Sequence, residues 1–243
     1  MDSVIEEFKG RAAEVDAYFA FLENTLGPEA CTRPTRDAPD KPIPSETQMV
    51  LKAAAFLVLY NAVEATVRSA VAEVYSALIK KAVTFEKARD EIRRLYIGIE
   101  FGKRFPGDVA ASFEGYRSHA LTLVNRAIQR EVLQMEVLGR GWGNLDAQQI
   151  RVLCERHGID LGAAEELPGG GSVRTVKERR NHLAHGEFTF SEVGRDYSIK
   201  DLHRIKKEVY DFISKVLDRF RRFVDGAKYL RPIPPAAQEA APT

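Results

Sequence analysis

The sequence predicts an all-α protein, an irregular helical bundle arranged around one long central helix. Apolar residues recur at intervals of about three and four positions along most of the chain, which is the spacing of amphipathic helices. The segments between these patterns are rich in glycine and proline, which end helices. Between residues 53 and 63 the pattern is apolar on every side, as expected for a helix buried at the centre of the fold.

The composition is that of a globular protein, with 44% hydrophobic and 29% charged residues in a chain of 243. The formal net charge of +1 provides no general basic field, so any binding of nucleic acid would depend on a local patch. Cys31 and Cys154 lie far apart and have neither a disulfide nor a metal spacing. We therefore expect a reducing compartment and no metal or other cofactor.

The sequence also predicts a cytoplasmic location. The first residues are acidic and of mixed character, unlike the basic and apolar segments of a signal peptide. The apolar run over residues 53–63 is about half as long as a bilayer span needs.

Seven helices are expected from these patterns. They cover residues 2–26, 46–81, 85–97, 108–137, 146–157, 173–185 and 199–225. Two pairs have the spacing of a capping box at the start of a helix, Ser45 with Gln48 and Ser198 with Asp201. Gly226 is positioned to end the last helix.

The connecting segments suggest how the chain is divided. Five prolines place residues 28–44 in a loop. The segment LPGGGS, residues 167–172, is interpreted as a flexible joint, and residues 188–197 as extended chain. We divide the chain into an N-terminal helix with a Pro-rich loop, a helical domain, and a disordered tail rich in proline and alanine, over residues 1–44, 45–226 and 227–243.

The stretch VKERRNHLAHGEF, residues 176–188, concentrates polar and basic side chains. On a helix with about 100° between residues, Arg180 falls in the middle of the apolar side. An arginine at such a position is costly unless a partner compensates its charge. Asn181 and His185 lie one turn apart at the edge of that side, and Gly186 permits a sharp end to the helix.

A second interpretation of this stretch involves no chemistry. Basic residues and histidines stabilise the last turn of a helix through its dipole, and glycine is the usual cap. This interpretation leaves the inward position of Arg180 unexplained. His182 falls on the opposite side of the helix from Arg180 and is expected to be solvated rather than catalytic.

The segment RNHLAH resembles the R-x4-6-H motif of the HEPN superfamily, with Arg180 as the arginine, Asn181 as the polar residue that often follows it, and His185 as the histidine. The surrounding sequence is similar to the MAE_28990/MAE_18760-like branch of that superfamily. The similar segments are NLDAQQIRVLCERHGI, the stretch from VKERRNHLAHGEF to SIKDL, and YNAVEATV in the central helix. The resemblance extends over residues 45–225.

This resemblance implies a small helical bundle that dimerises and brings two motifs together across a shared cleft. Many proteins of the superfamily are metal-independent endoribonucleases of toxin–antitoxin, abortive-infection or restriction systems. The first hypothesis is therefore an endoribonuclease of a toxin–antitoxin or anti-phage defence system, with RNA, a second copy of the chain and an antitoxin or regulatory protein as partners. The alternative is a HEPN module that binds RNA or a protein as a regulatory or structural dimer without cleaving RNA.

The three motif residues suit cleavage of RNA without a metal. Histidine titrates near neutral pH, so His185 could take the proton from the 2′-hydroxyl or donate one to the leaving 5′-oxygen. The Arg180 guanidinium would stabilise the charge on the phosphorane. Asn181 would orient His185 or hold a phosphate. Two copies would supply both an acid and a base, and the expected products carry a 2′,3′-cyclic phosphate and a 5′-hydroxyl.

Further residues are expected to support this site. Three basic side chains precede the motif on the same helix and are the candidates for binding RNA, namely Arg174, Lys177 and Arg179. Glu64 and His182 are the supporting residues. Glu64 lies in the apolar part of the central helix, where it could pair with Arg180 and fix the guanidinium, or with Arg68 one turn further on.

Overall fold

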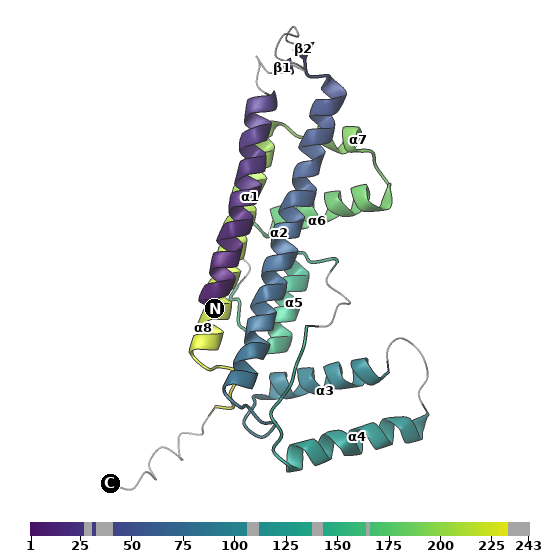
Figure 1. Ribbon diagram of the computed structural model, residues 1–243, viewed down its shortest axis with the longest axis vertical. Helices are drawn as coiled ribbons and strands as arrows, with labels where there is room; N and C mark the ends of the chain where they lie inside the picture. The colour runs from purple at the N-terminus through teal and green to yellow at the C-terminus, as the bar shows by residue number, and fades with distance from the viewer. Residues whose placement is uncertain (27–30, 33–40, 106–111, 138–142, 164–165, 233–243) are drawn as a thin grey trace, which may run out of the picture.

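The computed structural model describes residues 1–26, 31–32, 41–105, 112–137, 143–163 and 166–232. Within these residues the protein is all-α, as predicted (Figure 1). The helices are α1 (Asp2–Leu26), α2 (Ser45–Lys80), α3 (Asp90–Arg104), α4 (Phe113–Ile128), α5 (Ala147–His157), α6 (Gly170–His185), α7 (Phe190–Arg195) and α8 (Ile199–Asp225). Two short strands, β1 (Cys31–Thr32) and β2 (Lys41–Pro42), pair antiparallel.

The long helices α1, α2 and α8 run side by side along the length of the molecule (Figure 1). The helices α5, α6 and α7 pack on the other side of α2, while α3 and α4 lie across one end of the bundle (Figure 1). Because α2 contacts α1, α6, α7 and α8, it is the central helix that its apolar sequence predicts. The candidate motif lies on α6, which projects from the bundle on the same side as α3 and α4 (Figure 1).

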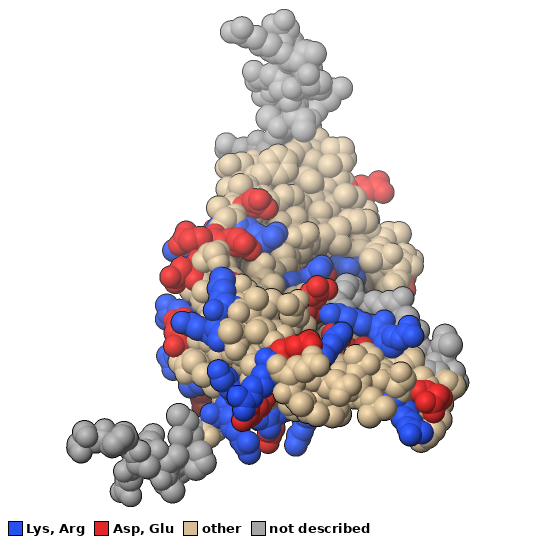
Figure 2. Space-filling view, turned by 60° about the horizontal axis from the view of Figure 1, so that its bottom comes forward, with Lys and Arg blue, Asp and Glu red and all other residues tan. Residues whose placement is uncertain are grey.

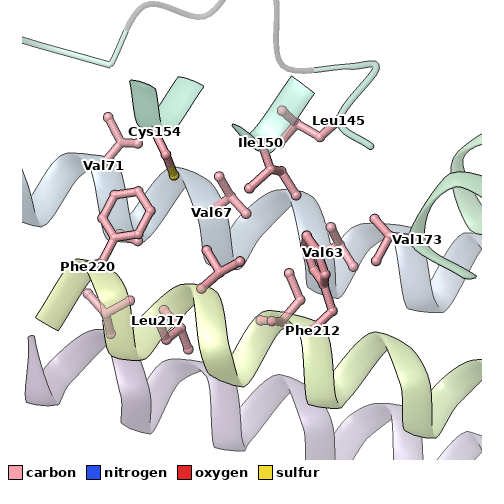
Figure 3. Close-up of a cluster of buried hydrophobic side chains, with 14 of the residues drawn as sticks. Val63, Val67, Val71, Leu145, Ile150, Cys154, Val173, Phe212, Leu217 and Phe220 are labelled. Atoms are coloured by element: carbon pink, nitrogen blue, oxygen red, sulfur yellow. The ribbon is translucent and has the colours of Figure 1, made fainter. Parts of the chain in front are cut away.

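The core is built on the valine ridge of α2, formed by Val63, Val67 and Val71 (Figure 3). Side chains from three other helices converge on this ridge: Ile150 and Cys154 from α5, Val173 from α6, and Phe212, Leu217 and Phe220 from α8 (Figure 3). All of these side chains are buried, so their apolar surface stabilises the packing of α5 and α6 on α2. This packing fixes the helix that carries the motif.

The N-terminal helix shares this core rather than forming a separate unit. Val15, Phe19 and Leu22 of α1 are buried against the bundle. The other end of the helical domain also extends beyond its predicted boundary at residue 226. Tyr229 is buried, and Leu230 forms a bridge with Ala88, whereas residues 233–243 of the expected tail lie outside the described chain.

The first helix and the last helix agree with the predicted ranges, and the capping box of Ser198 with Asp201 is present. The capping box predicted for Ser45 is wrong. The N-cap of α2 is Pro44, so Ser45 is already inside the helix, and the Gln48 side chain donates to the carbonyl of Ile43 instead. The C-cap of α8 is Gly226, as expected, although its φ of −79° is not left-handed.

The helices α3 and α4 differ from their predicted ranges because extended chain precedes one and follows the other. Thr84 forms a bridge with Val132, and Leu133 donates its amide to Val83. These pairings keep residues 83–89 and 131–137 out of helices, although their apolar spacing continues. The result is that α3 begins at Asp90 and α4 ends at Ile128.

Two connecting segments also differ from expectation. Residues 190–195 form the helix α7, because Thr189 and Glu192 make a capping box that the extended interpretation overlooked. The glycines of LPGGGS belong to the start of α6 and are not a joint. Gly169 is the N-cap with φ +97°, and its backbone lies so close to Glu208 of α8 that a side chain would clash.

By length and composition, α2 is apolar enough to cross a membrane, and its apolar window is longer than the run of residues 53–63 suggested. Half of that window is buried inside the protein, which is typical of a core helix.

Candidate functional site

Arg180 points from α6 toward α2, as its place on the apolar side of the helix predicts. Its guanidinium carbon lies 4.6 Å from the centroid of the Tyr60 ring, within the range of a cation–π interaction. One nitrogen of the guanidinium donates to the Asn181 side-chain oxygen at 2.9 Å and to the carbonyl of Gly143 at 3.2 Å. An aromatic face and two oxygens therefore compensate the charge of this half-buried arginine.

Tyr60 is the residue that sequence reasoning missed. Its hydroxyl accepts a hydrogen bond of 3.0 Å from the amide of Leu145, which fastens the segment before α5 to α2. Burial raises the pKa of Tyr60, the nearby Glu64 carboxylate raises it further, and the Leu145 amide and the Arg180 charge oppose that rise. The one available signal was a tyrosine in an aliphatic run, four residues before Glu64 and hence on the same face.

Asn181 holds Arg180 rather than His185. Its oxygen accepts from the guanidinium, and its amide nitrogen donates to the side-chain oxygen of Asn144 at 2.7 Å. Asn144 was also missed, since it lies in a turn far from the motif in sequence. The expectation that Asn181 orients the imidazole of His185 has no support in these contacts.

His185 is the last residue of α6 and is exposed. Its side chain has no hydrogen bond, ion pair or ring contact with any described residue. Gly186 caps the helix with φ +68°, as predicted. The geometry therefore leaves His185 open to an incoming ligand.

His182 lies apart from these groups. Its ring packs against Phe188 at a centroid distance of 4.9 Å, and its Nε2 lies 3.6 Å from a carboxylate oxygen of Glu187. Its side chain is 30% exposed rather than fully solvated. His182 therefore stabilises the turn after α6 and does not face Arg180.

The three expected RNA-binding residues each have a partner within the protein. Lys177 donates to Asp146 at 2.8 Å, and both side chains are mostly buried. Arg179 donates to the hydroxyl of Tyr197 at 2.9 Å, and its guanidinium lies over the same ring. These two contacts attach α6 to its neighbours.

Arg174 is the exception among the three basic residues. Its side chain is 71% exposed and pairs at 2.7 Å with Glu178, one turn along the same helix. Because an exposed pair of this kind is only weakly held in water, Arg174 can exchange its partner for a phosphate.

An open pocket of about 250 Å³ lies beside Arg180. It is lined by Leu57, Tyr60, Asn61, Glu64, Ala65, Arg68 and Arg180. Both expected pairings of Glu64, with Arg180 and with Arg68, therefore fall within one small space. Two guanidinium groups and one carboxylate give the pocket a net positive character, which suits an anionic ligand.

The fold and this site define a class of protein: an all-α bundle in which an arginine, an asparagine and an exposed histidine occupy the end of one helix, beside a positively charged pocket. The sequence matches the HEPN_MAE_28990-like HEPN family over residues 1–229, and the chain belongs to this family. The match includes α1, which we placed outside the helical domain from the sequence. Searches of curated proteins and of solved structures found no match.

Proposed function

We propose that this HEPN protein is a metal-independent endoribonuclease that works as a homodimer. The observation that carries the proposal is the contrast between two residues of one helix end. Arg180 is fixed on three sides at the edge of a pocket, while His185, five residues further on, is left without any partner in the described chain. RNA cleavage needs a positive charge to stabilise the phosphorane and an imidazole to transfer a proton, and this end of α6 supplies one of each.

The proposed reaction is attack by the 2′-hydroxyl of the RNA on the adjacent phosphorus. One imidazole takes the hydroxyl proton as the new bond between 2′-oxygen and phosphorus forms. The Arg180 guanidinium stabilises the negative charge on the phosphorane oxygens. The bond to the 5′-oxygen then breaks, and a second imidazole protonates that oxygen. The products carry a 2′,3′-cyclic phosphate and a 5′-hydroxyl.

The need for two imidazoles favours a dimer. His182, the other histidine of this segment, packs against Phe188 and lies on the opposite side of α6 from Arg180, so it is a poor candidate for the second group. A two-fold arrangement would supply His185 from each of two copies and would make the site symmetric.

RNA on either side of the cleaved bond would meet Arg174, whose exposed side chain can bind phosphate. Lys177 and Arg179 would contribute positive potential, but their main role would be to hold α6 in place. Glu64 would limit the charge of the pocket and so help to select the ligand. His182 would support the turn beyond the motif.

The biological setting that fits such an enzyme is a toxin–antitoxin or anti-phage defence system in the cytoplasm, with an antitoxin or regulatory protein covering the basic groups. Expression of the protein alone should then arrest growth, and the His185→Ala variant should not. His182→Ala is the matched control and should arrest growth like the wild type. Equal arrest by wild type and His185→Ala would show that the toxicity does not depend on His185, and a wild type that does not arrest growth would contradict the toxin hypothesis.

The activity itself is tested with purified protein and total RNA in EDTA, followed by sequencing of the new ends. We expect cleavage with 2′,3′-cyclic phosphate ends for the wild type and for His182→Ala, and at least a hundredfold slower cleavage for His185→Ala. Cleavage at wild-type rate by His185→Ala would show that the site is wrongly assigned.

One observation favours a second candidate function, a module that binds RNA or a protein without cleaving. Arg180 already has three partners within the protein, so its role could be structural. In that case RNA would bind with an affinity that falls steeply with salt and would remain intact after long incubation.

A further inference from the structure

The helix α4 exposes an unusual amount of apolar surface. Of its large apolar residues only Leu123 is buried. Among the described residues, every large apolar side chain that is more than half exposed lies on this helix: Phe113 at 82%, Leu121 at 56%, Val124 at 52% and Ile128 at 73%. In Figure 2, where the lower end of the molecule comes forward, the surface in the region of α4 is mostly uncharged, with charged side chains at one end. Surfaces of this kind are binding sites more often than ordinary solvent-facing surfaces.

These side chains form one stripe. With about 100° between residues, Phe113, Leu121, Val124 and Ile128 fall within about 80° of one another around the helix. Arg117 lies in the middle of the stripe, and its exposed guanidinium is 3.8 Å from Glu114. The stripe runs the length of a helix of 16 residues, which is about 24 Å.

Two pairs of residues in the stripe are equally spaced about the middle of α4. Phe113 and Ile128 are equally far from the midpoint between residues 120 and 121, and so are Arg117 and Val124. A second α4 laid antiparallel about this midpoint would therefore set large apolar side chains opposite one another at both ends. It would also set the aliphatic part of each Arg117 against Val124 of the other copy.

At the centre of the stripe, a protruding side chain, Leu121, lies next to an apolar cavity. Between α3 and α4 lies an apolar cavity of about 210 Å³, and Ala120 and Val124 are part of its lining. In the antiparallel arrangement Leu121 of each copy falls opposite Ala120 of the other, at the mouth of this cavity. Each copy would supply one knob and one hole, as the interface of a two-fold dimer requires.

We propose that α4 is the contact surface for a second copy of this chain, with two α4 helices packed antiparallel about a two-fold axis near residues 120 and 121. The direction of the helices supports this arrangement. In Figure 1 α4 lies across the long axis of the bundle, and α6 projects from the bundle on the same side. A two-fold axis perpendicular to α4 and beside its middle reverses α4 in the second copy, and each α6 then projects from its own bundle on the side that carries the contact. This surface would join the two copies that the proposed function needs. The contact itself is argued without that function, and only its biological role rests on it.

Sedimentation equilibrium of the full chain tests the contact. Wild-type protein should have twice the chain mass of 27.2 kDa, and Leu121→Glu should have the mass of one chain. Phe21→Glu is the matched control, because Phe21 is 50% exposed on α1, and it should remain a dimer. Unchanged circular dichroism of Leu121→Glu would show that the fold is intact.

Cross-linking tests the antiparallel register in a Cys31→Ser background, which leaves the buried Cys154 as the other cysteine. Leu121→Cys should form a disulfide between two copies on mild oxidation. Phe113→Cys should not cross-link to itself, but should cross-link to chains that carry Ile128→Cys.

Three outcomes would overturn the inference: a Leu121→Glu variant that remains a dimer, a dimer in which Leu121→Cys does not cross-link, or a wild-type monomer. A wild-type monomer that floats with anionic vesicles would assign α4 to a membrane surface instead, and one that does not would assign it to another protein. None of these measurements involves RNA. A dimer that cleaves no RNA would therefore contradict the proposed function and leave this inference intact.

Discussion

The guanidinium of Arg180 and the ring of Tyr60 form the contact that organises the candidate site, with 4.6 Å between the guanidinium carbon and the ring centroid. The two residues come from α6 and α2, which are far apart in sequence and adjacent in the core. A cation–π contact in a partly desolvated place is worth about 1 to 2 kcal/mol and leaves the edge of the guanidinium free for hydrogen bonds. The ring can therefore fix the position of the arginine and leave its charge intact, whereas a carboxylate would neutralise that charge.

Replacing Tyr60 by leucine should lower kcat for RNA cleavage by roughly 5- to 30-fold, because the guanidinium loses about 1 to 2 kcal/mol of positioning. Tyr60→Phe is the matched control, since it keeps the ring and loses the hydrogen bonds of the hydroxyl to Leu145 and Glu64. It should retain most of kcat and lose stability instead. Single-turnover kinetics and urea unfolding separate the two effects. Wild-type kcat in Tyr60→Leu would show that the ring does not position Arg180.

Lys177 should contribute to stability rather than to RNA binding. Although burial raises the pKa of Asp146, hydrogen bonds from Lys177 and from the Gln149 amide hold it below its usual value. Lys177→Met should lower the free energy of unfolding by about 1 to 2 kcal/mol, the usual worth of a hydrogen bond between charged groups. A double-mutant cycle with Asp146→Asn, measured by urea unfolding, gives the coupling between the two.

The salt dependence of RNA binding distinguishes Lys177 from Arg174. Arg174→Met should reduce the slope of log K against log salt by about 1, and Lys177→Met should leave it unchanged. A reduced slope in Lys177→Met would place that lysine on the RNA.

Stability should fall in mild acid because of His157, which is 3% exposed at the end of α5. Its Nδ1 lies 2.7 Å from the carbonyl of Leu153, so it carries the proton, and its Nε2 accepts from the hydroxyl of Tyr75 at 3.0 Å. Burial lowers the pKa of His157 from 6.5 to about 4. The unfolded chain therefore binds a proton between pH 6.5 and 4 that the folded chain does not bind.

The contribution of His157 to stability is thus complete above pH 6.5 and is lost as the pH falls toward 4, by about 3 kcal/mol in total. Urea unfolding at intervals from pH 7.5 to 4 measures this slope. The His157→Asn variant should be less stable at every pH, and its free energy of unfolding should lack the part of the pH dependence that comes from His157. An identical slope in both proteins would rule out His157 as its source.

Gly194→Ala should destabilise the protein by about 3 kcal/mol, because α7 packs with the backbone of Gly194 against the backbone of Met49 in α2, and an added methyl group would clash there. Gly10→Ala in α1, where the space is open, is the control and should be neutral or slightly stabilising. Thermal unfolding compares the two. A neutral Gly194→Ala variant would mean that α7 can move away from α2 at little cost.

Much of the fold was predictable because its signals are local. The apolar spacing of residues 199–225 and the serine and aspartate before it define α8, and the glycine after His185 defines the end of α6. The predicted start of α3 was wrong because Thr84 and Ala88 pair with residues that are far away in the sequence. The short helix α7 was not predicted because its capping box was overlooked, although the sequence contains both residues of the box.

The candidate site was predictable in part. The helical wheel placed Arg180 on the inner side of α6, because that side is defined by neighbours three and four residues away. No such rule indicates that Tyr60 receives the guanidinium, that Asn144 receives the amide of Asn181, or that Lys177 is held by Asp146. Each of these partners comes from another element, so its identity depends on how the helices are packed.

By itself, the sequence determined the helical class of the protein, the position of its motif at the end of a helix, and the side of that helix on which Arg180 lies. These properties follow from periodicity and capping, which act over a few residues. Only the tertiary structure decided that Tyr60 holds Arg180, that His185 is exposed, and that the apolar stripe of α4 is exposed. The physical reason is that an apolar pattern shows which face of a helix avoids water, whereas the packing of the whole chain decides what covers that face.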